Sequence, residues 1–262
     1  MNILTYGNDK RVSVCRYCLE QQLSDLTVPG LKLSRILLLP IPSTKDKETV
    51  NGTKTPLAEL LPLAGPDTLI AGYGIPDTLR REVGEAGGLL ADVSRDEKFE
   101  RENARLSALG VLGYLLNTSP RAPADLSVGV IGYGKIGREL VRLLLFLGAD
   151  VRVYSGKETV CLELGKYGVR TVHVSYDSGE AVDLSGLSVL VNTAPAPLIR
   201  TEDLPDPPPR ILEVASGENL PADTSVERLP SLPGRMYPES AGIAYAASIH
   251  RMLFGAPSKK GM

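Results

Sequence analysis

The sequence contains no tryptophan, three cysteines and two histidines among its 262 residues. An odd and small number of cysteines fits free thiols better than a disulfide framework. The second Cys-x-x-C or pair of histidines that would complete a structural zinc site is also missing, because His173 and His250 lie far apart in the sequence. We therefore expect reduced cysteines and no metal centre.

Cys15 and Cys18 form a Cys-x-x-C, whereas Cys161 lies far from them in the sequence. Such a pair could be redox-active or provide half of a zinc site. At the i, i+3 spacing of a helix, however, two cysteines more often supply small buried side chains. We favour this structural interpretation.

An excess of charge of one sign is missing as well, since 29 basic and 31 acidic residues give a formal net charge of −2. This balance provides no general attraction for nucleic acid or for anionic lipid. No apolar run approaches the roughly 20 residues that cross a bilayer, and the first residues lack the basic and apolar parts of a secretory signal. We expect a cytoplasmic protein without nucleic-acid or membrane partners.

What the sequence does contain is an alternation of short apolar runs and amphipathic segments, which is typical of βα units in a parallel sheet. In the first hundred residues the pattern predicts a helix and four strands, at residues 11–23 and at 2–6, 36–39, 68–71 and 89–93. The polar segment 43–55 follows the second strand. It is therefore expected at the carboxyl edge of the sheet, where α/β proteins bind ligands.

A long helix is predicted at residues 96–116, and a second αβ series follows it. Its strands are expected at residues 127–131, 151–154, 170–174, 188–192 and 210–214, and a last helix at 239–254. This pattern predicts an α/β fold with two doubly wound, Rossmann-like domains. We assign 1–100 to a flavodoxin- or Rossmann-like substrate domain, 101–118 to a linking helix, 119–237 to a nucleotide-binding domain, and 238–255 to a helix that returns to the first domain.

The motif Gly-x-Gly-x-x-Gly occurs at Gly132, Gly134 and Gly137, directly after an apolar run and directly before a helical pattern. In this context the first glycine permits the turn, the second allows close approach of a pyrophosphate, and the third allows helix and strand to pack closely. The helix start, which includes Lys135 and Ile136, offers N–H groups to the phosphates. A glycine turn without a ligand is the alternative, and the strand and helix around the motif disfavour it.

The end of the next predicted strand indicates which coenzyme is preferred. NAD-binding sites commonly have an acidic residue there, which bonds the ribose 2′-hydroxyl, whereas this chain has Ser155 followed by Lys157. A serine can donate a hydrogen bond to a 2′-phosphate, and a lysine can supply charge. The sequence thus favours NADP(H) over NAD(H); the alternative is that Lys157 merely opens a solvated helix.

Small residues follow the fourth and fifth strands of the second series. They leave room for the ribose and nicotinamide at the carboxyl edge of the sheet. Ordinary turn chemistry explains any single one of them equally well. The candidates for coenzyme contact are Thr193, Ala194, Pro195, Ala215 and Ser216.

Across nearly its whole length the sequence resembles the A chain of dipicolinate synthase, a family of spore-forming bacteria that is related in architecture to D-2-hydroxyacid dehydrogenases and S-adenosylhomocysteine hydrolase. The segment 232–242, Leu-Pro-Gly-Arg-Met-Tyr-Pro-Glu-Ser-Ala-Gly, is the most distinctive part of the resemblance. The other segments that carry it are Gly7 to Arg11, Leu39 to Thr44, Arg95 and Asp96 with Asn103, the glycine motif, Asn192 to Pro195, and Val214 to Ser216.

The resemblance implies NADP-dependent oxidation of dihydrodipicolinate to dipicolinate, on a branch of the lysine and diaminopimelate pathway used in sporulation. It also implies a flavoprotein-like second subunit of dipicolinate synthase as partner and a homo-oligomeric assembly. A substrate with two carboxylates calls for cations and hydroxyl groups. The candidate substrate residues are Arg11, Ser43, Thr44, Asn103 and Arg235. For each of them a solvated surface role is the alternative.

Two alternatives to this function stay open. After Ser216 the family continues with Pro-Gly-Gly, whereas this chain has Gly217 and Glu218, so a related acid could be the substrate. An ordinary NAD(P)-dependent 2-hydroxyacid dehydrogenase resembles the chain in architecture, but such enzymes use an arginine near Ser216 and a late catalytic histidine, and His250 lies inside the last predicted helix. A non-catalytic nucleotide-binding subunit is the second alternative, because the sequence indicates no acid-base residue.

Overall fold

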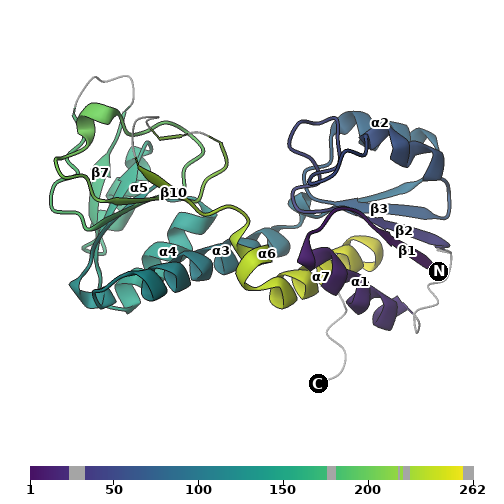
Figure 1. Ribbon diagram of the computed structural model, residues 1–262, viewed down its shortest axis with the longest axis horizontal. Coiled ribbons are helices and arrows are strands. Elements are labelled where there is room, and N and C mark those ends of the chain that lie inside the picture. Colours follow the sequence, from purple (N-terminus) through teal and green to yellow (C-terminus); the bar gives the residue numbers. More distant parts are fainter. Residues whose placement is uncertain (24–32, 176–180, 218, 221–224, 256–262) are drawn as a thin grey trace. The chain divides into compact units, whose positions relative to one another are not determined.

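The computed structural model describes residues 1–23, 33–175, 181–217, 219–220 and 225–255. The chain forms two compact units, Met1–Asn103 with Pro233–Met262, and Ala104–Leu232. Each unit has a parallel sheet (Figure 1). Each also has its own apolar core. The predicted α/β class with two Rossmann-like units is therefore confirmed. The linking helix α3 (Glu97–Thr118) contributes its beginning to the first unit and the rest to the second.

The sheet of the first unit has four parallel strands in the order β1-β2-β3-β4. The strands are β1 (Asn2–Thr5), β2 (Arg35–Leu38), β3 (Thr68–Gly72) and β4 (Leu89–Asp92), close to the predicted ranges. All five residues of β3 are buried. Central strands of a parallel sheet are covered on both faces, which explains why β2 and β3 read as apolar runs instead of alternating.

Helices cover both faces of this sheet. The helix α1 (Lys10–Leu23) packs on one face, and the 3₁₀ segment η1 (Leu57–Leu63) and α2 (Asp77–Glu85) pack on the other. The strands step along the sheet in one direction, yet α1 and α2 lie on opposite faces. The crossovers β1–α1–β2 and β3–α2–β4 therefore have opposite hands, so that one of them has the uncommon left-handed form. The elements η1 and α2 are additional to the predicted ones.

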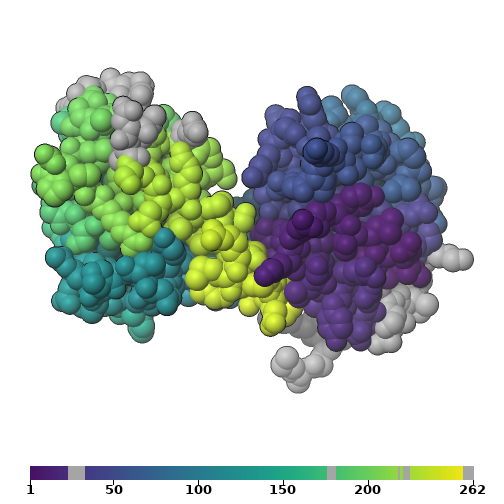
Figure 2. Space-filling model, in the orientation of Figure 1, coloured from purple at the N-terminus to yellow at the C-terminus, as the bar shows by residue number. Residues whose placement is uncertain are grey.

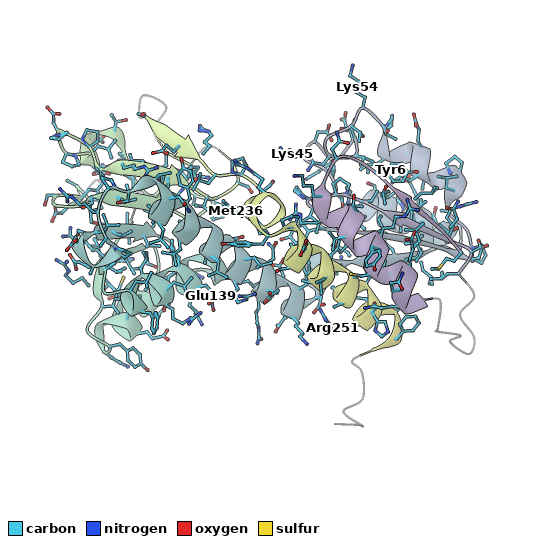
Figure 3. The ribbon with its side chains drawn as sticks, turned by 60° about the horizontal axis from the view of Figure 1, so that its bottom comes forward. Tyr6, Lys45, Lys54, Glu139, Met236 and Arg251 are labelled. Carbon is cyan, nitrogen blue, oxygen red and sulfur yellow. The ribbon has the colours of Figure 1, made fainter. Side chains whose placement is uncertain are left out.

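The C-terminal helix α7 (Pro238–Phe254) returns to the first unit and packs beside α1, as predicted (Figure 2). A Cβ atom added at Gly242 would lie 2.5 Å from Cβ of Val14, so the two helices approach closely at this glycine. Asp96 accepts hydrogen bonds from Oγ of Ser248 at 2.6 Å and from Nη2 of Arg251 at 2.5 Å. Arg251 is labelled on α7 in Figure 3. Apolar packing and a charged pair together hold α7 on this unit.

The packing of α1 on the sheet accounts for the burial of Cys15 and Cys18. Cys15 is fully buried and Cys18 is partly buried, and both are free thiols. Burial raises the pKa of Cys15 well above its ordinary value. The structural interpretation of these two cysteines as small buried side chains fits this arrangement.

The sheet of the second unit has six parallel strands in the order β10-β9-β8-β5-β6-β7. The strands are β5 (Ser127–Ile131), β6 (Asp150–Ser155), β7 (Arg170–His173), β8 (Val189–Asn192), β9 (Arg210–Glu213) and β10 (Val226–Arg228). The strand β10 is additional to the predicted strands. The order reverses between β5 and β8, which is the switch point at which dinucleotide-binding domains hold their ligand.

One face of the second sheet carries α3, α4 (Lys135–Phe146) and α5 (Glu158–Gly165). The helix α3 buries Ala108, Val111, Leu112 and Leu115, a spacing that places all four on one side. On the other face, Ile131 and Tyr154 belong to a separate core. Connecting segments help to cover it, among them Ile199 and Leu204 on either side of η5 (Thr201–Asp203). Among the described residues no α-helix covers that face, so loops form the second layer of this unit.

Three short elements complete the description. They are η2 (Val93–Arg95), η3 (Pro123–Asp125) and α6 (Leu232–Met236). In the described part of the chain, no helix is both long and apolar enough to cross a membrane.

Candidate functional site

The glycine loop, residues Gly132 to Gly137, connects β5 to α4 at the switch point of the second sheet. Gly132 has a φ of +88°, which residues other than glycine rarely adopt. Its N–H donates to the carbonyl oxygen of Tyr154 at 2.8 Å. Gly134 caps the helix, because its carbonyl oxygen accepts the N–H of Arg138 at 2.9 Å. The predicted strand, turn and helix are thus present in the required order.

Gly137 is closely surrounded by other atoms, whereas Gly134 is not. A Cβ atom added at Gly137 would lie 2.2 Å from the carbonyl oxygen of Gly132 and 2.9 Å from Oγ1 of Thr193. A Cβ atom added at Gly134 would meet no atom within 4 Å. Gly137 is therefore required by packing within the chain, whereas the space in front of Gly134 is open to a ligand.

The start of α4 is suited to an anion. The first-turn N–H groups of a helix have no acceptor within the helix, and the helix dipole adds partial positive charge there. The first turn of α4 contains no acidic residue, and Lys135 is exposed in it while Ile136 is half-buried. Open space at Gly134 and an uncovered helix start together fit a pyrophosphate, the group that such loops bind.

Ser155 and Lys157 lie at the carboxyl end of β6, the strand beside β5. Ser155 is buried, and its Oγ accepts the N–H of Lys157 at 3.1 Å. Lys157 is the N-cap of α5 and is exposed, and its side chain has no ion-pair partner among the described residues. The hydroxyl group therefore shapes the turn, while the free cation beside it can meet a ligand.

The segment Asn192 to Ala194 packs directly against the glycine loop. Thr193 donates to the carbonyl oxygen of Ile131 from both N and Oγ1, each at 2.9 Å. A Cβ atom at Gly132 would lie 3.0 Å from Cβ of Ala194. Pro195 follows and is exposed. Thr193 and Ala194 are thus brought to the glycine loop, as expected for residues at adjacent strand ends.

Glu213 and Asn192 form a buried polar pair that the sequence did not indicate. They are the last residues of the adjacent strands β9 and β8, and Nδ2 of Asn192 donates to both carboxylate oxygens of Glu213, at 3.0 and 3.2 Å. Burial raises the pKa of Glu213, and the hydrogen bond from Asn192 opposes that rise. The available signal was a glutamate directly after the apolar pair Ile211 and Leu212 of β9. The predicted Ala215 and Ser216 follow Glu213; Ala215 is half-buried and Ser216 is exposed.

In the first unit, Arg11 and Ser43 are both buried and both bonded within the chain. Nη2 of Arg11, a residue that is 4% exposed, donates to Oδ2 of Asp9 at 2.7 Å and to the carbonyl oxygen of Ile41 at 2.5 Å. Oγ of Ser43 accepts the N–H of Tyr73 at 2.7 Å. These contacts give both residues a structural role, and their contact with a substrate stays a prediction.

The other substrate candidates are more accessible. Thr44 is half-buried in the polar loop, where its Oγ1 donates to Asp46 at 2.9 Å. Asn103 is half-buried on α3, and Arg235 is exposed on α6. Arg235 has no ion-pair partner among the described residues, so its guanidinium is the freest cation of this set.

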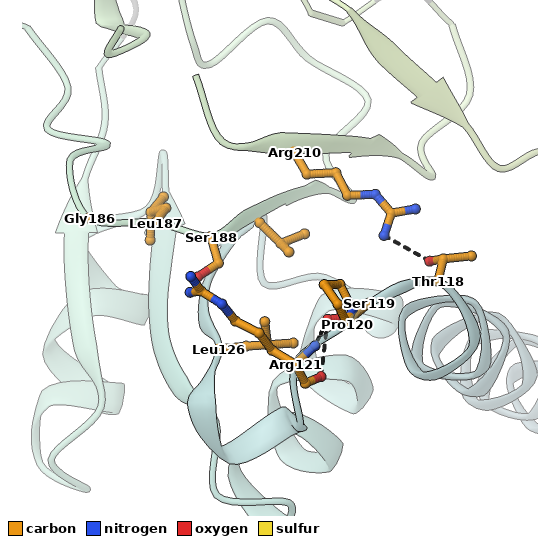
Figure 4. Close-up of a pocket in the computed structure, with 10 residues that line it drawn as sticks. Thr118, Ser119, Pro120, Arg121, Leu126, Gly186, Leu187, Ser188 and Arg210 are labelled. Carbon is orange, nitrogen blue, oxygen red and sulfur yellow. Dashed lines mark hydrogen bonds between the residues drawn. The ribbon is translucent and has the colours of Figure 1, made fainter. Parts of the chain in front are cut away.

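A cavity of about 520 Å³ lies at the amino edge of the second sheet, where β5, β8 and β9 begin, whereas the glycine loop follows the carboxyl end of β5. Figure 4 shows the residues that line it. Its charged lining residues are Arg121 and Arg210, and Arg210 is paired with Glu227 through Nη2 at 2.8 Å. The cavity lies apart from every residue predicted to hold a coenzyme. The described residues contain no group of three or more histidine, cysteine, aspartate or glutamate side chains that could hold a metal ion.

Comparison with known proteins gives matches among solved structures alone, since neither a protein-family model nor a curated protein sequence matches the chain. The A chain of dipicolinate synthase from Bacillus halodurans aligns with a TM-score of 0.74 and 17% identity, over 97% of this chain and 98% of that one. The A chain of dipicolinate synthase from Bacillus subtilis has a TM-score of 0.70 and 17% identity, over 96% and 94% of the two chains.

A transhydrogenase from Sinorhizobium meliloti is also similar, with a TM-score of 0.61 and 13% identity over 96% of this chain and 93% of that one. At such identities the likeness shows the fold. The resemblance to the dipicolinate synthase family that the sequence motifs carry is therefore matched by a likeness in fold across the whole chain.

Proposed function

We propose that this protein is a nicotinamide-dependent oxidoreductase that binds its coenzyme at the glycine loop of the second unit. The observation that carries this proposal is the turn from β5 into α4 at the switch point, with open space in front of Gly134. The first-turn N–H groups of α4 hold the pyrophosphate, and Thr193 and Ala194 keep the loop in position from the neighbouring strand.

We infer a preference for NADP(H) over NAD(H). The support is the absence of a carboxylate at Ser155 and the exposed cation of Lys157 directly after it. A 2′-phosphate would be repelled by an acidic side chain at this place and attracted by a lysine. The main-chain N–H of Lys157 donates to Oγ of Ser155. The side chain of Lys157 takes no part in this bond and is available for the phosphate.

We further propose a dihydrodipicolinate, or a closely related cyclic dicarboxylate, as the substrate. The support is the fold shared with the A chain of dipicolinate synthase and the sequence motifs of residues 7–11, 39–44 and 232–242. The bound coenzyme would accept a hydride from a ring carbon. One proton leaves the ring as well, and the products are an aromatic dicarboxylate and the reduced coenzyme.

Arg235 and Thr44 are the candidates for contact with the substrate carboxylates. Arg235 is exposed and without an ion-pair partner in the described part of the chain, and Thr44 lies in the polar loop after β2. Arg11 acts differently in this account. Its buried pair with Asp9 holds the start of α1 against the carbonyl oxygen of Ile41, so it shapes the loop from within.

The proposed reaction is tested by mixing the purified chain, with and without a flavoprotein-like second subunit, with freshly prepared dihydrodipicolinate and NADP⁺. We expect dipicolinate absorbance to appear together with NADPH. Coenzyme binding without turnover of this substrate or of 2-hydroxy acids, with or without that second subunit, would support a nucleotide-binding subunit instead. Turnover of 2-hydroxy acids alone would identify the chain as an ordinary hydroxyacid dehydrogenase.

A further inference from the structure

Glu213 holds a buried carboxylate at the carboxyl edge of the second sheet. The residue is 4% exposed, and the described residues provide no ion-pair partner for it. Nδ2 of Asn192 donates hydrogen bonds to both of its carboxylate oxygens, at 3.0 and 3.2 Å. Donated hydrogen bonds favour the ionised form of a carboxyl group and oppose the effect of burial, which raises the pKa of Glu213.

Arg228 lies opposite Glu213 in register on β10, and its charge opposes the rise in the pKa of Glu213. Arg228 is exposed, so solvent screens its charge. A negative charge that is buried without a bonded cation is costly, and such charges occur mainly where they act on a ligand.

Glu213 is also connected to the glycine loop by hydrogen bonds. The Asn192 side chain that donates to Glu213 also bonds Ala194 twice, accepting its N–H at 3.0 Å and donating to its carbonyl oxygen at 3.1 Å. Ala194 in turn packs against Gly132. The carboxylate therefore belongs to the same rigid edge of the sheet as the coenzyme residues.

If this side chain served only to hydrogen-bond Asn192, it would need no charge, since a glutamine could accept that hydrogen bond as well. The charge becomes useful if the ligand itself changes charge. The oxidised nicotinamide ring is a cation and the reduced ring is neutral, so a fixed negative charge nearby stabilises the oxidised form selectively.

We propose that the carboxylate of Glu213 makes the site bind the oxidised nicotinamide coenzyme in preference to the reduced one. The proposal rests on the proposed coenzyme function and adds a specific role for one side chain. Glu213 acts through its charge, and Asn192 orients it.

The test is calorimetric titration of NADP⁺ and of NADPH into the wild-type chain and into Glu213→Gln at pH 8. Glutamine keeps the shape and one acceptor but removes the charge. We expect the ratio of the dissociation constants, NADPH over NADP⁺, to fall about fivefold in the variant, a typical effect of one screened charge. The reduction potential of the bound coenzyme should rise accordingly.

Two further variants separate charge from structure. Glu213→Asp keeps the charge and should keep the ratio, even if both affinities fall, and it serves as the test if Glu213→Gln does not fold. Glu163→Gln removes an exposed carboxylate from α5 and should leave the ratio unchanged. Equal weakening of both coenzyme forms by Glu213→Gln would overturn the proposal while the coenzyme function stands. A wild-type chain that binds neither form would instead refute the coenzyme function.

Discussion

The glycines of the glycine loop are needed for different reasons, and mutation can separate these reasons. Gly137 is surrounded by the carbonyl group of Gly132 and the side chain of Thr193, so its missing side chain serves internal packing. Gly134 faces open space at a φ of −76°, which any residue can adopt. Its missing side chain therefore serves a ligand, because nothing in the chain itself requires a glycine there.

We expect Gly137→Ala to lower the stability of the protein and Gly134→Ala to leave it unchanged. The added methyl group at residue 137 must push α4 away from the turn, an overpacking that costs about 1–3 kcal/mol. Thermal unfolding followed by circular dichroism measures both effects. Equal melting temperatures for the wild type and Gly137→Ala would show that the helix start is not packed as described.

A second residue-scale prediction concerns coenzyme choice. Replacing Ser155 by Asp keeps an acceptor for the N–H of Lys157, so the turn is preserved. The added negative charge should weaken NADPH at least about tenfold while NADH is affected much less, because only NADPH carries the 2′-phosphate. Fluorescence titration with both coenzymes measures this difference. The same loss for both would remove the basis for preferring the phosphorylated coenzyme.

At the scale of elements, a charged cluster ties α3 to the edge of the second sheet. Arg210 of β9 donates to Glu227 of β10 and to Oγ1 of Thr118 on α3, and Tyr114 of α3 donates to Glu227 at 2.6 Å. The hydrogen bond from Arg210 lowers the pKa of Glu227 from 4.5 to about 2. The short strand β10 has only three residues, and this cluster compensates for its few ladder hydrogen bonds.

Because its pKa is lowered on folding, ionised Glu227 stabilises the protein fully above pH 4.5, and this stabilisation is lost as the pH falls toward 2. We expect Glu227→Gln to melt below the wild type at pH 7 and the gap to narrow steadily from pH 5 to pH 3. Melting curves at several pH values provide the measurement, with Glu163→Gln as an exposed control. A gap that is independent of pH would argue against this assignment.

Elements differ in how well the sequence predicts them. The strands β5 and β8 were predictable because burial on both faces leaves continuous apolar runs. The helix α2 was not, since only Leu79 and Val83 of its nine residues are buried, and β10, Val-Glu-Arg, has no strand-like pattern at all. The loops that cover one face of the second sheet also leave no periodic signal.

The residues of the candidate site also differ in how well the sequence predicts them. The glycine loop was predictable because its chemistry is local in sequence, with strand, turn and helix in succession. The pair of Asn192 and Glu213 was not, because it depends on the pairing of β8 with β9 and joins residues 21 positions apart. Arg11 has the residue type of a substrate ligand, but sequence cannot show that Asp9 and Ile41 already occupy its guanidinium.

At the scale of the whole molecule, the two units have separate cores and carry separate groups of candidate residues. The coenzyme residues belong to Ala104–Leu232, and the substrate candidates belong to Met1–Asn103 with Pro233–Met262. A ligand that binds the folded state alone stabilises it by about 2.7 kcal/mol at a hundredfold excess over its dissociation constant. Binding of coenzyme should therefore stabilise the second unit more than the first.

Hydrogen exchange with and without NADP⁺ tests this division. We expect the largest gain in protection in peptides that cover residues 131–137 and 192–194, and little change in β2 and β3 of the first unit. Protection confined to the first unit would place the coenzyme elsewhere.

The proposed function depends above all on binding of the pyrophosphate of a nicotinamide coenzyme by the glycine loop. Calorimetric titration of NADP⁺ into the wild-type chain and into Gly134→Ala tests it most directly. We expect one site in the wild type and an affinity at least about tenfold lower in the variant, because the methyl group occupies the space of the phosphates while the fold is unchanged. Absence of binding to the wild type at millimolar coenzyme, or equal binding to both proteins, would contradict it.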